Sequence, residues 1–131
     1  MGSELSVSTR SRAEMVDITA MVQEVVTASG TSQGVCHVYV PHTTAGITIN
    51  ENADPDVPSD VLAVLDKLVP WVADYQHVEG NAAAHVKASL VGSCVAILVR
   101  GGRLALGTWQ GVFLCEFDGP RRRKALVSIS S

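Results

Sequence analysis

The sequence predicts an α+β fold with mostly antiparallel sheets of about seven or eight strands and three helices. Short alternating or apolar segments typical of strands occur near both ends of the chain and in its middle. Three stretches between them have the apolar spacing or the alanine content of helices. No repeat, linker or low-complexity segment interrupts the chain, so residues 1–131 are expected to form a single domain.

The first 30 residues are expected to form a strand and then a helix. Residues 5–9 alternate apolar and polar side chains, as a half-buried strand does. Apolar residues between positions 18 and 26 then recur at the spacing of one helical face, which indicates packing against a core. Asp17 or Thr19 can cap the start of this helix, and Gly30 can end it in a left-handed turn.

A polar turn between two apolar strands is the most distinctive stretch of the chain. A strand over residues 34–40 meets Pro41, which cannot donate to a strand ladder and therefore predicts a break. The break leaves the His42 imidazole and the Thr43 hydroxyl able to face a ligand. The second strand ends by placing Asn50 and Glu51 in a loop, and we predict that these polar groups line a site.

Two more helices are expected in the middle of the chain. The first covers residues 61–69, with a start either at Asp54 or nearer Ser59, and Pro70 ends it. A polar loop that carries Tyr75, His77 and Glu79 follows. The second helix is alanine-rich, covers residues 82–90, has Asn81 as its cap and stops at Gly92.

The last forty residues are expected to form sheet. Residues 94–99 are continuously apolar, as in a strand covered on both faces, and a two-residue hairpin signal at Gly101 and Gly102 follows. A kink at residues 107–111 interrupts the next segment. Trp109 in this kink is either a ligand platform or a core or interface residue, and we favour the second interpretation. Alternating residues 125–129 then mark the final strand.

Composition narrows the classes of function. Charged residues make up 18% of the chain, against about 25% in an average domain, so part of the surface is expected to lie in an oligomer interface. The net charge of −3 argues against nucleic-acid binding. The three cysteines lie in apolar contexts without metal spacing and are interpreted as buried thiols in a reducing cytoplasm. No apolar run is long enough to span a membrane.

Three of the four histidines are candidate metal ligands. His37 lies inside a strand and is interpreted as structural, whereas His42, His77 and His85 stand in polar or turn contexts on three different elements. Three converging imidazoles form a common catalytic metal arrangement with an open position, for which zinc fits best and iron, cobalt or nickel are alternatives. Three separately hydrogen-bonded histidines remain the other interpretation.

Carboxylates occur near these histidines in sequence. Glu51, Asp54, Asp60 and Glu79 could orient a metal-bound imidazole or act as a general base. Asp54 and Asp60 also have a simpler interpretation as caps of the second helix. Glu51 and Glu79 have no such local role.

A basic run at residues 121–124 follows a turn. Most such runs are solvated or attract nucleic acid weakly, but Arg121 could bind a phosphate or carboxylate through two hydrogen bonds. Lys87, Thr43, Asn81 and the amides at the start of the third helix could supply further donors. Together these groups predict a small phosphorylated substrate.

Several motifs resemble those of the YjbQ-like family. They are the segments 42–45, 49–51, 54–55 with Asp60, 75–81, 84–87, 106–110 and 116–121. The resemblance covers about residues 17–127. It implies a compact α+β homotrimer with a cleft near the subunit boundaries, where a metal would bind. It also implies a secondary thiamine-phosphate synthase activity, which joins a hydroxymethylpyrimidine diphosphate to a thiazole phosphate and releases pyrophosphate.

The resulting prediction is a cytosolic trimeric enzyme that acts on small phosphorylated heterocycles. The alternative is a non-catalytic trimer that binds a metal or small ligand in a regulatory or scavenging pathway. The expected metal ligands are His42, His77 and His85, with a divalent metal, zinc favoured. The expected catalytic carboxylates are Glu51, Glu79 and Asp60. The expected substrate and phosphate ligands are Thr43, Asn50, Asn81, Lys87 and Arg121.

Overall fold

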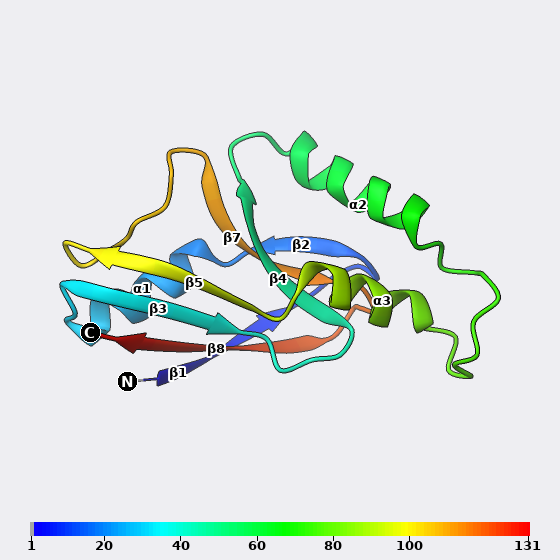
Figure 1. Cartoon of the computed structure of the whole chain (residues 1–131), viewed down its shortest axis with the longest axis horizontal. Helices are drawn as coiled ribbons and strands as arrows, with labels where there is room; N and C mark the ends of the chain where they lie inside the picture. Colours follow the sequence, from blue (N-terminus) through cyan, green and yellow to red (C-terminus); the bar gives the residue numbers. More distant parts are fainter. Residues whose placement is uncertain (1) are drawn as a thin grey trace.

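The computed structural model describes residues 2–131, and its elements match the predicted α+β class. This range contains three helices and eight strands, and their arrangement can be followed in Figure 1. The strands are β1 (Gly2–Ser8), β2 (Glu14–Asp17), β3 (Gln33–Tyr39), β4 (Ala45–Glu51), β5 (Cys94–Arg100), β6 (Arg103–Leu104), β7 (Gln110–Glu116) and β8 (Arg122–Ser130). The helices are α1 (Thr19–Ser29), α2 (Asp56–Leu68) and α3 (Ala82–Val91).

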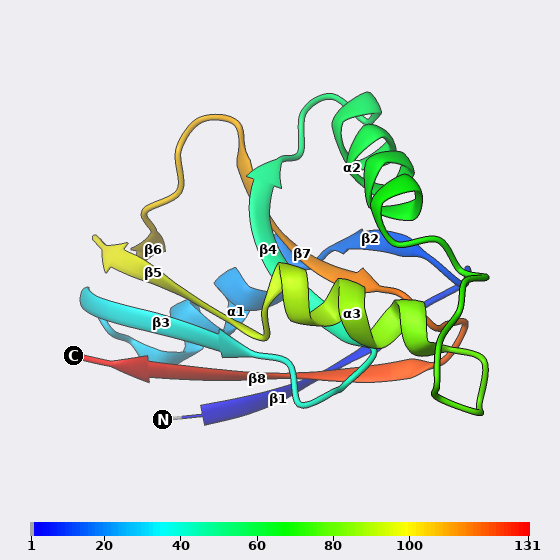
Figure 2. The same cartoon turned by 45° about the vertical axis from the view of Figure 1, so that its right-hand side comes forward.

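The strands form two antiparallel sheets. The larger sheet has the order β1-β8-β3-β5-β6, and the smaller one has the order β2-β7-β4. In residues 2–131 every paired strand runs antiparallel to its neighbours. The helices α2 and α3 lie on the side of the small sheet, as Figures 1 and 2 show. Within residues 2–131 the outer face of the large sheet has no helix over it.

The main core lies between the inner face of the large sheet, the helix α1 and one face of the small sheet. Val38, Val99 and Val127 contribute from the large sheet, Val22 contributes from α1, and Leu114 contributes from β7, all of them buried. Burying such side chains is the dominant favourable term in folding, at about 1.5–3 kcal/mol each. This core fixes β7 and β8, the two strands whose side chains form the base of the site described below.

The strand that is buried on both faces is β7, not β5. Val112 and Leu114 of β7 enter the main core, whereas Phe113 and Cys115 enter a second cluster under α3. The prediction that residues 94–99 are covered on both faces is wrong, because Ile97 is buried but its neighbour Leu98 is 50% exposed. The apolar run of β5 instead leaves an apolar outer face.

The first helix forms as predicted. The carboxylate of Asp17 accepts the backbone N–H of Thr19 at 2.9 Å, which satisfies a donor at the helix start. Gly30 follows the last turn with a φ of +69°, the left-handed conformation expected of a glycine there. The hairpin between β5 and β6 also forms, with Arg100 paired to Arg103.

The third helix differs from the prediction at its cap. Asn81 precedes Ala82, but within the described chain its side chain makes no capping hydrogen bond, because its amide group points to Asp118 instead. The helix ends where it meets β4, since the Gly92 carbonyl accepts the Ile47 N–H at 3.0 Å. Gly46 makes this approach possible.

Gly46→Ala is expected to lower the free energy of unfolding by about 1–3 kcal/mol, as overpacking does. A Cβ atom at this position would lie 2.6 Å from the carbonyl oxygen of Gly92, which is backbone and cannot move aside cheaply. Urea unfolding of the variant measures the loss, and Gly2→Ala, whose Cβ would lie 3.5 Å from its nearest neighbour, is the control. Equal stability of both variants would show that α3 moves freely on β4.

The helix α2 begins at Asp56 after Pro55 at the N-cap position, and within residues 2–131 no side chain makes a capping hydrogen bond there, although Asp54 accepts the Asp56 N–H at 2.9 Å. The interpretation of Asp60 as a cap is wrong, because Asp60 lies inside the helix. Among the described residues of α2, none is buried. Leu62 and Leu65 contact the second cluster, while Val64 and Leu68 are 54% and 69% exposed. No helix within residues 2–131 has the length and apolar character that a bilayer crossing requires.

Two side chains of the sheet region are more exposed than a core position allows. Trp109 does not fill the core of the chain, because it is 63% exposed on the loop before β7, and its place in an interface stays a prediction. Cys36 and Cys115 are buried, but Cys94 is exposed at the start of β5 on the uncovered outer face. Both residues lie where the chain itself supplies no second layer.

Candidate functional site

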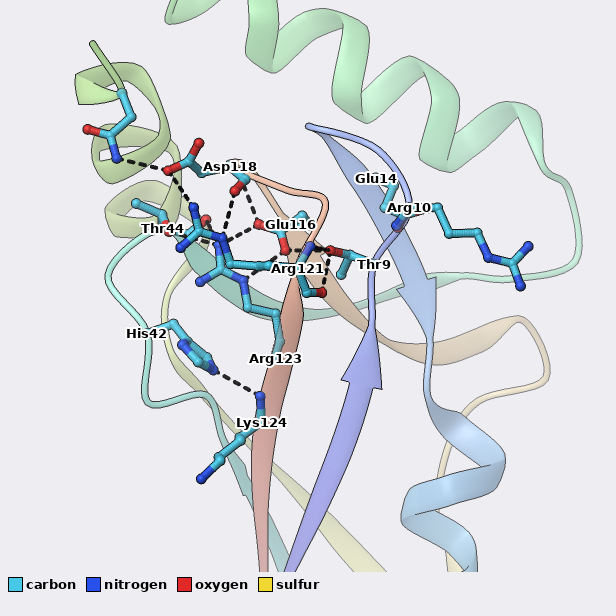
Figure 3. A network of polar contacts seen from close by, with 11 residues as sticks. Thr9, Arg10, Glu14, His42, Thr44, Glu116, Asp118, Arg121, Arg123 and Lys124 are labelled. Atoms are coloured by element: carbon cyan, nitrogen blue, oxygen red, sulfur yellow. Dashed lines mark hydrogen bonds and ion pairs between the residues drawn. The ribbon is translucent and has the colours of Figure 1, made fainter. Parts of the chain in front are cut away.

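A buried ion pair joins β7 to β8 and forms the base of the candidate site (Figure 3). The Arg123 guanidinium donates to both carboxylate oxygens of Glu116, with Nε 2.8 Å from Oε1. Arg123 is 2% exposed and Glu116 is fully buried. A bidentate pair in such surroundings is both strong and geometrically specific.

Further hydrogen bonds complete the coordination of this pair. The Thr9 hydroxyl donates to Oε1 of Glu116 at 2.8 Å and accepts the Arg121 N–H at 2.9 Å. The Arg123 guanidinium also donates to the Thr44 hydroxyl at 2.8 Å. The network therefore ties the end of β1 and the start of β4 to β7 and β8.

The pKa of Glu116 lies below its ordinary value despite the burial of the group. Burial by itself raises this pKa, but hydrogen bonds from Arg123, from the Asp118 amide and from Thr9 stabilise the ionised form more strongly. The folded protein therefore favours the ionised form of the Glu116 carboxylate. Stability contributed in this way is fully present above the ordinary value of 4.5 and is lost as the pH falls through the lower folded pKa.

Glu116→Gln should therefore be most destabilising near neutral pH. The difference in unfolding free energy between the unmodified protein and this variant is expected to be constant above about pH 5 and to shrink below it. Urea titrations at several pH values measure the difference. A gap that stays the same down to about pH 3 would contradict the lowered pKa.

His42 lies on the loop between β3 and β4, beside Arg123 and Lys124 near the start of β8 (Figure 3). Its Nε2 accepts the backbone N–H of Lys124 at 2.9 Å. The pKa of His42 is lowered, first by partial burial and then by the nearby Arg123, with Arg121 and Lys124 acting in the same direction and Glu116 opposing them. The imidazole therefore sits in mainly cationic surroundings.

Asp118 connects the start of α3 to the turn before β8. Its carboxylate accepts the Asn81 amide at 2.8 Å and pairs with the Arg121 guanidinium at 3.2 Å. The side-chain oxygen of Asn81 is buried, and within residues 2–131 it has no hydrogen-bond partner. About half of the Arg121 side chain is exposed.

Two of the three candidate metal ligands lie together. The rings of His77 and His85 are 5.1 Å apart between centroids, at an interplanar angle of 79°. Glu79 approaches His77, with Oε1 3.9 Å from Nε2. Within residues 2–131 no group of three or more histidine, cysteine, aspartate or glutamate side chains is placed to hold a metal ion. A single chain therefore does not assemble the expected three-histidine centre.

Other predicted site residues lie elsewhere. Lys87 is 4% exposed and pairs with Asp66 at 3.1 Å, so it ties α3 to α2. The prediction that Asn50 and Glu51 lie in a loop is wrong, because they are the last residues of β4 and pair with β7, at the far end of β4 from Thr44. A groove of about 750 Å³ lies beside that far end of β4.

The remaining predicted residues are at the surface. Asp60 is exposed on α2 and Thr43 is exposed beside His42. The structure thus brings His42, Asn81 and Arg121 to one region, with His77 and His85 as a neighbouring pair on α3 and the loop before it.

Sequence reasoning missed the buried members of the site. Thr9, Glu116 and Arg123 were not among the expected site residues, and the basic run was interpreted as solvated apart from Arg121. The alternation of apolar residues that predicted the last strand could also have identified Arg123 as a buried residue. Arg123 has the same parity as Ala125 and therefore faces the core, where a charge requires a partner.

Comparison with known proteins identifies the family. A model described as "UPF0047 protein YjbQ-like" matches residues 3–131. The chain is 50% identical over 126 residues to the UPF0047 protein YugU of Bacillus subtilis, covering 95% of this chain and 96% of that protein. The chain belongs to the YjbQ-like UPF0047 family.

Solved structures of the family have the same fold. A YjbQ/UPF0047 protein from Clostridium acetobutylicum superposes with a TM-score of 0.96 at 55% identity, covering 98% of this chain and 99% of that one. A hypothetical protein from Aeropyrum pernix superposes with a TM-score of 0.96 at 35% identity, covering 100% and 98%. These relatives are described only as uncharacterized or hypothetical, so they confirm the fold and the family.

Proposed function

We propose that this protein is a cytosolic trimeric enzyme that acts on small phosphorylated heterocycles and forms thiamine phosphate. The observation that carries the proposal is the basic region at the start of β8, where Arg121, Arg123 and Lys124 surround His42. Arg123 is held by Glu116, but the half-exposed Arg121 can turn toward a ligand. Such a region suits a substrate with phosphate groups.

The proposed reaction makes use of this charge. The ring nitrogen of the thiazole phosphate attacks the methylene carbon of the pyrimidine diphosphate, and the bond from that carbon to the diphosphate oxygen breaks. The pyrophosphate that leaves carries growing negative charge, which fixed donors stabilise more in the transition state than in the substrate. Arg121, Thr43 and the N–H groups at the start of α3 are the donors we assign to it.

A divalent metal, zinc favoured, is part of the proposal, and two residues fit it. Two imidazoles on one tetrahedral zinc, bound at about 2.0–2.1 Å, have ring centroids on the order of 5 Å apart. His77 and His85 have this spacing. When bound, the metal would neutralise charge on the diphosphate. The remaining ligands would come from water, substrate or another subunit.

Among the predicted carboxylates, Glu79 is placed to serve beside His77 as an orienting group or a base. Glu51 and Asp60 lie on other parts of the chain, and we propose that they act only if a neighbouring subunit brings them to the histidines. Asn50 precedes Glu51 on β4, and we propose the same condition for it. Lys87 is occupied by Asp66 and supports α3 rather than the phosphate.

A ring of three subunits is supported by two different exposed apolar surfaces. One is the outer face of the large sheet, with Tyr39, Leu98 and Leu126 between 37% and 50% exposed. The other lies on α2, α3 and the loop between them and comprises Val64, Leu68, Val72, Val78, Val86 and Leu90. Two unlike surfaces on one chain suit head-to-tail contacts, which close into a ring.

Turnover tests the proposed function. Purified protein is incubated with the two thiamine precursors, and both thiamine phosphate and pyrophosphate are measured. Arg121→Ala is expected to lower kcat/KM by about 10- to 100-fold, the value of a charge-assisted hydrogen bond. Arg122→Ala removes an exposed neighbouring arginine and should change kcat/KM by less than about twofold.

The outcome separates the enzyme from its alternative. Product and pyrophosphate in equal amounts support the synthase. Binding of either precursor without product would favour a non-catalytic trimer that binds a small ligand or metal. Salt-sensitive retention on DNA or RNA would instead indicate a nucleic-acid protein.

His85→Ala is expected to abolish zinc uptake and leave the fold intact. His85 is only partly buried on α3, so its loss removes a ligand without opening the core. Elemental analysis measures the zinc content, and circular dichroism measures the fold. Full zinc occupancy in this variant would exclude His85 from the metal site.

A further inference from the structure

The two ring nitrogens of His42 have different tasks, and the structure determines which. The backbone N–H of Lys124 can only donate, so Nε2 of His42, which lies 2.9 Å away, accepts with its lone pair. A neutral imidazole carries one proton, and that proton then sits on Nδ1. With this hydrogen bond in place, neither nitrogen has a lone pair left for a metal ion.

The direction of this hydrogen bond is also opposite to the one that a metal-bound histidine usually makes. A histidine bound to a metal through one nitrogen usually donates its other N–H to a carboxylate or carbonyl oxygen. The partner of His42 is a donor rather than an acceptor. The ring is therefore oriented as a hydrogen-bond donor toward its other side.

The charges around His42 lead to the same conclusion. Arg121, Arg123 and Lys124 all lie close enough to disfavour a positive charge on the ring, and only Glu116 acts in the opposite direction. Glu116 and Arg123 neutralise each other, Arg121 pairs with Asp118 at 3.2 Å, and Lys124 pairs with Glu4 at 3.6 Å. The half-exposed Arg121 and Lys124 side chains can exchange these surface partners for an anion, whereas the acids near the ring are already paired with cations.

We propose that His42 binds an anionic oxygen of a substrate phosphate through Nδ1–H and is not a metal ligand. The identity of the substrate rests on the function proposed above, but the donor role rests on the Lys124 contact. Arg121 would contact the same phosphate group from the start of β8. The metal ligands that this chain supplies are then His77 and His85.

Separate titrations of zinc and of inorganic pyrophosphate test this assignment. His42→Ala is expected to weaken pyrophosphate binding by about 10- to 100-fold and to leave the zinc affinity unchanged. His42→Asn places an amide N–H close to the position of Nδ1 and should recover most of the pyrophosphate affinity. His85→Ala is the opposite control: it should lose zinc binding, and in a titration without zinc its pyrophosphate affinity should equal that of the unmodified protein.

Nitrogen NMR of the histidine rings tests the same point without a substitution. We expect His42 to carry its proton on Nδ1, and zinc to shift the ring nitrogens of His77 and His85 but not those of His42. A proton on Nε2, or a loss of zinc in His42→Ala as large as in His85→Ala, would overturn the assignment. Absence of thiamine-phosphate formation would refute the synthase but leave these affinities as expected.

Discussion

Arg123→Met is expected to lower the free energy of unfolding by about 3–5 kcal/mol. The substitution leaves the Glu116 carboxylate fully buried and without the guanidinium that now donates to both of its oxygens. It also removes the donor to the Thr44 hydroxyl. A buried carboxylate without its partner destabilises the protein by more than the intact ion pair stabilises it. The carboxylate is then still removed from water but no longer has the guanidinium to compensate for the lost hydration.

A double substitution separates the contribution of the ion pair to stability from the cost of an unpaired buried carboxylate. Glu116→Leu together with Arg123→Met removes both ions and fills the space with apolar groups, so most of the stability lost in the single variant should return. Arg122→Met, one residue away and exposed, should change stability by less than about 0.5 kcal/mol. Urea unfolding at a fixed protein concentration gives all four values.

The contrary result is also informative. A double variant no more stable than Arg123→Met would mean that the hydrogen bonds from Thr9 and the Asp118 amide, rather than the ion pair, hold the strands together. In that case the pair would be a means of fixing the geometry of the turn before β8, and loss of Arg121 positioning would accompany loss of stability.

Local patterns in the sequence were sufficient to predict most of the fold. The apolar stripe of α1, the paired glycines between β5 and β6, and the alternation of β8 each depend on spacing within one segment. The structure differs where a segment depends on what covers it. The apolar run of β5 does not reveal whether its second face is covered, and β7 is covered twice because α3 packs over Phe113 and Cys115.

The candidate site was only partly predictable for the same reason. His42, Asn81 and Arg121 occur at turns and helix ends, where polar side chains are exposed to ligands, and they do gather in one region. Glu116 and Arg123 meet across two strands, and sequence separation does not specify that meeting. The tautomer of His42 depends on a single backbone N–H, which no residue pattern indicates.

Val64→Lys combined with Leu68→Lys is expected to convert the proposed trimer into single chains. These two side chains lie one turn apart on α2 and extend its apolar face beyond the part covered by its own chain, at Leu62 and Leu65. Two ammonium groups in an apolar contact would be buried without partners, at a cost that exceeds the gain from the surrounding contacts. Light scattering after size-exclusion chromatography measures the mass.

The fold of the chain itself should survive this change, because Val64 and Leu68 are 54% and 69% exposed in it. Ser59→Lys, on the polar side of the same helix, is the matched control and should remain assembled. If the double variant dissociates and also loses turnover, the site requires a residue from the neighbouring subunit, for which Glu51 and Asp60 are the candidates. If it dissociates and stays active, the histidines, Arg121 and Glu79 of one chain are sufficient. A double variant that stays assembled would place the contact on another surface, of which the outer face of the large sheet is the other apolar candidate.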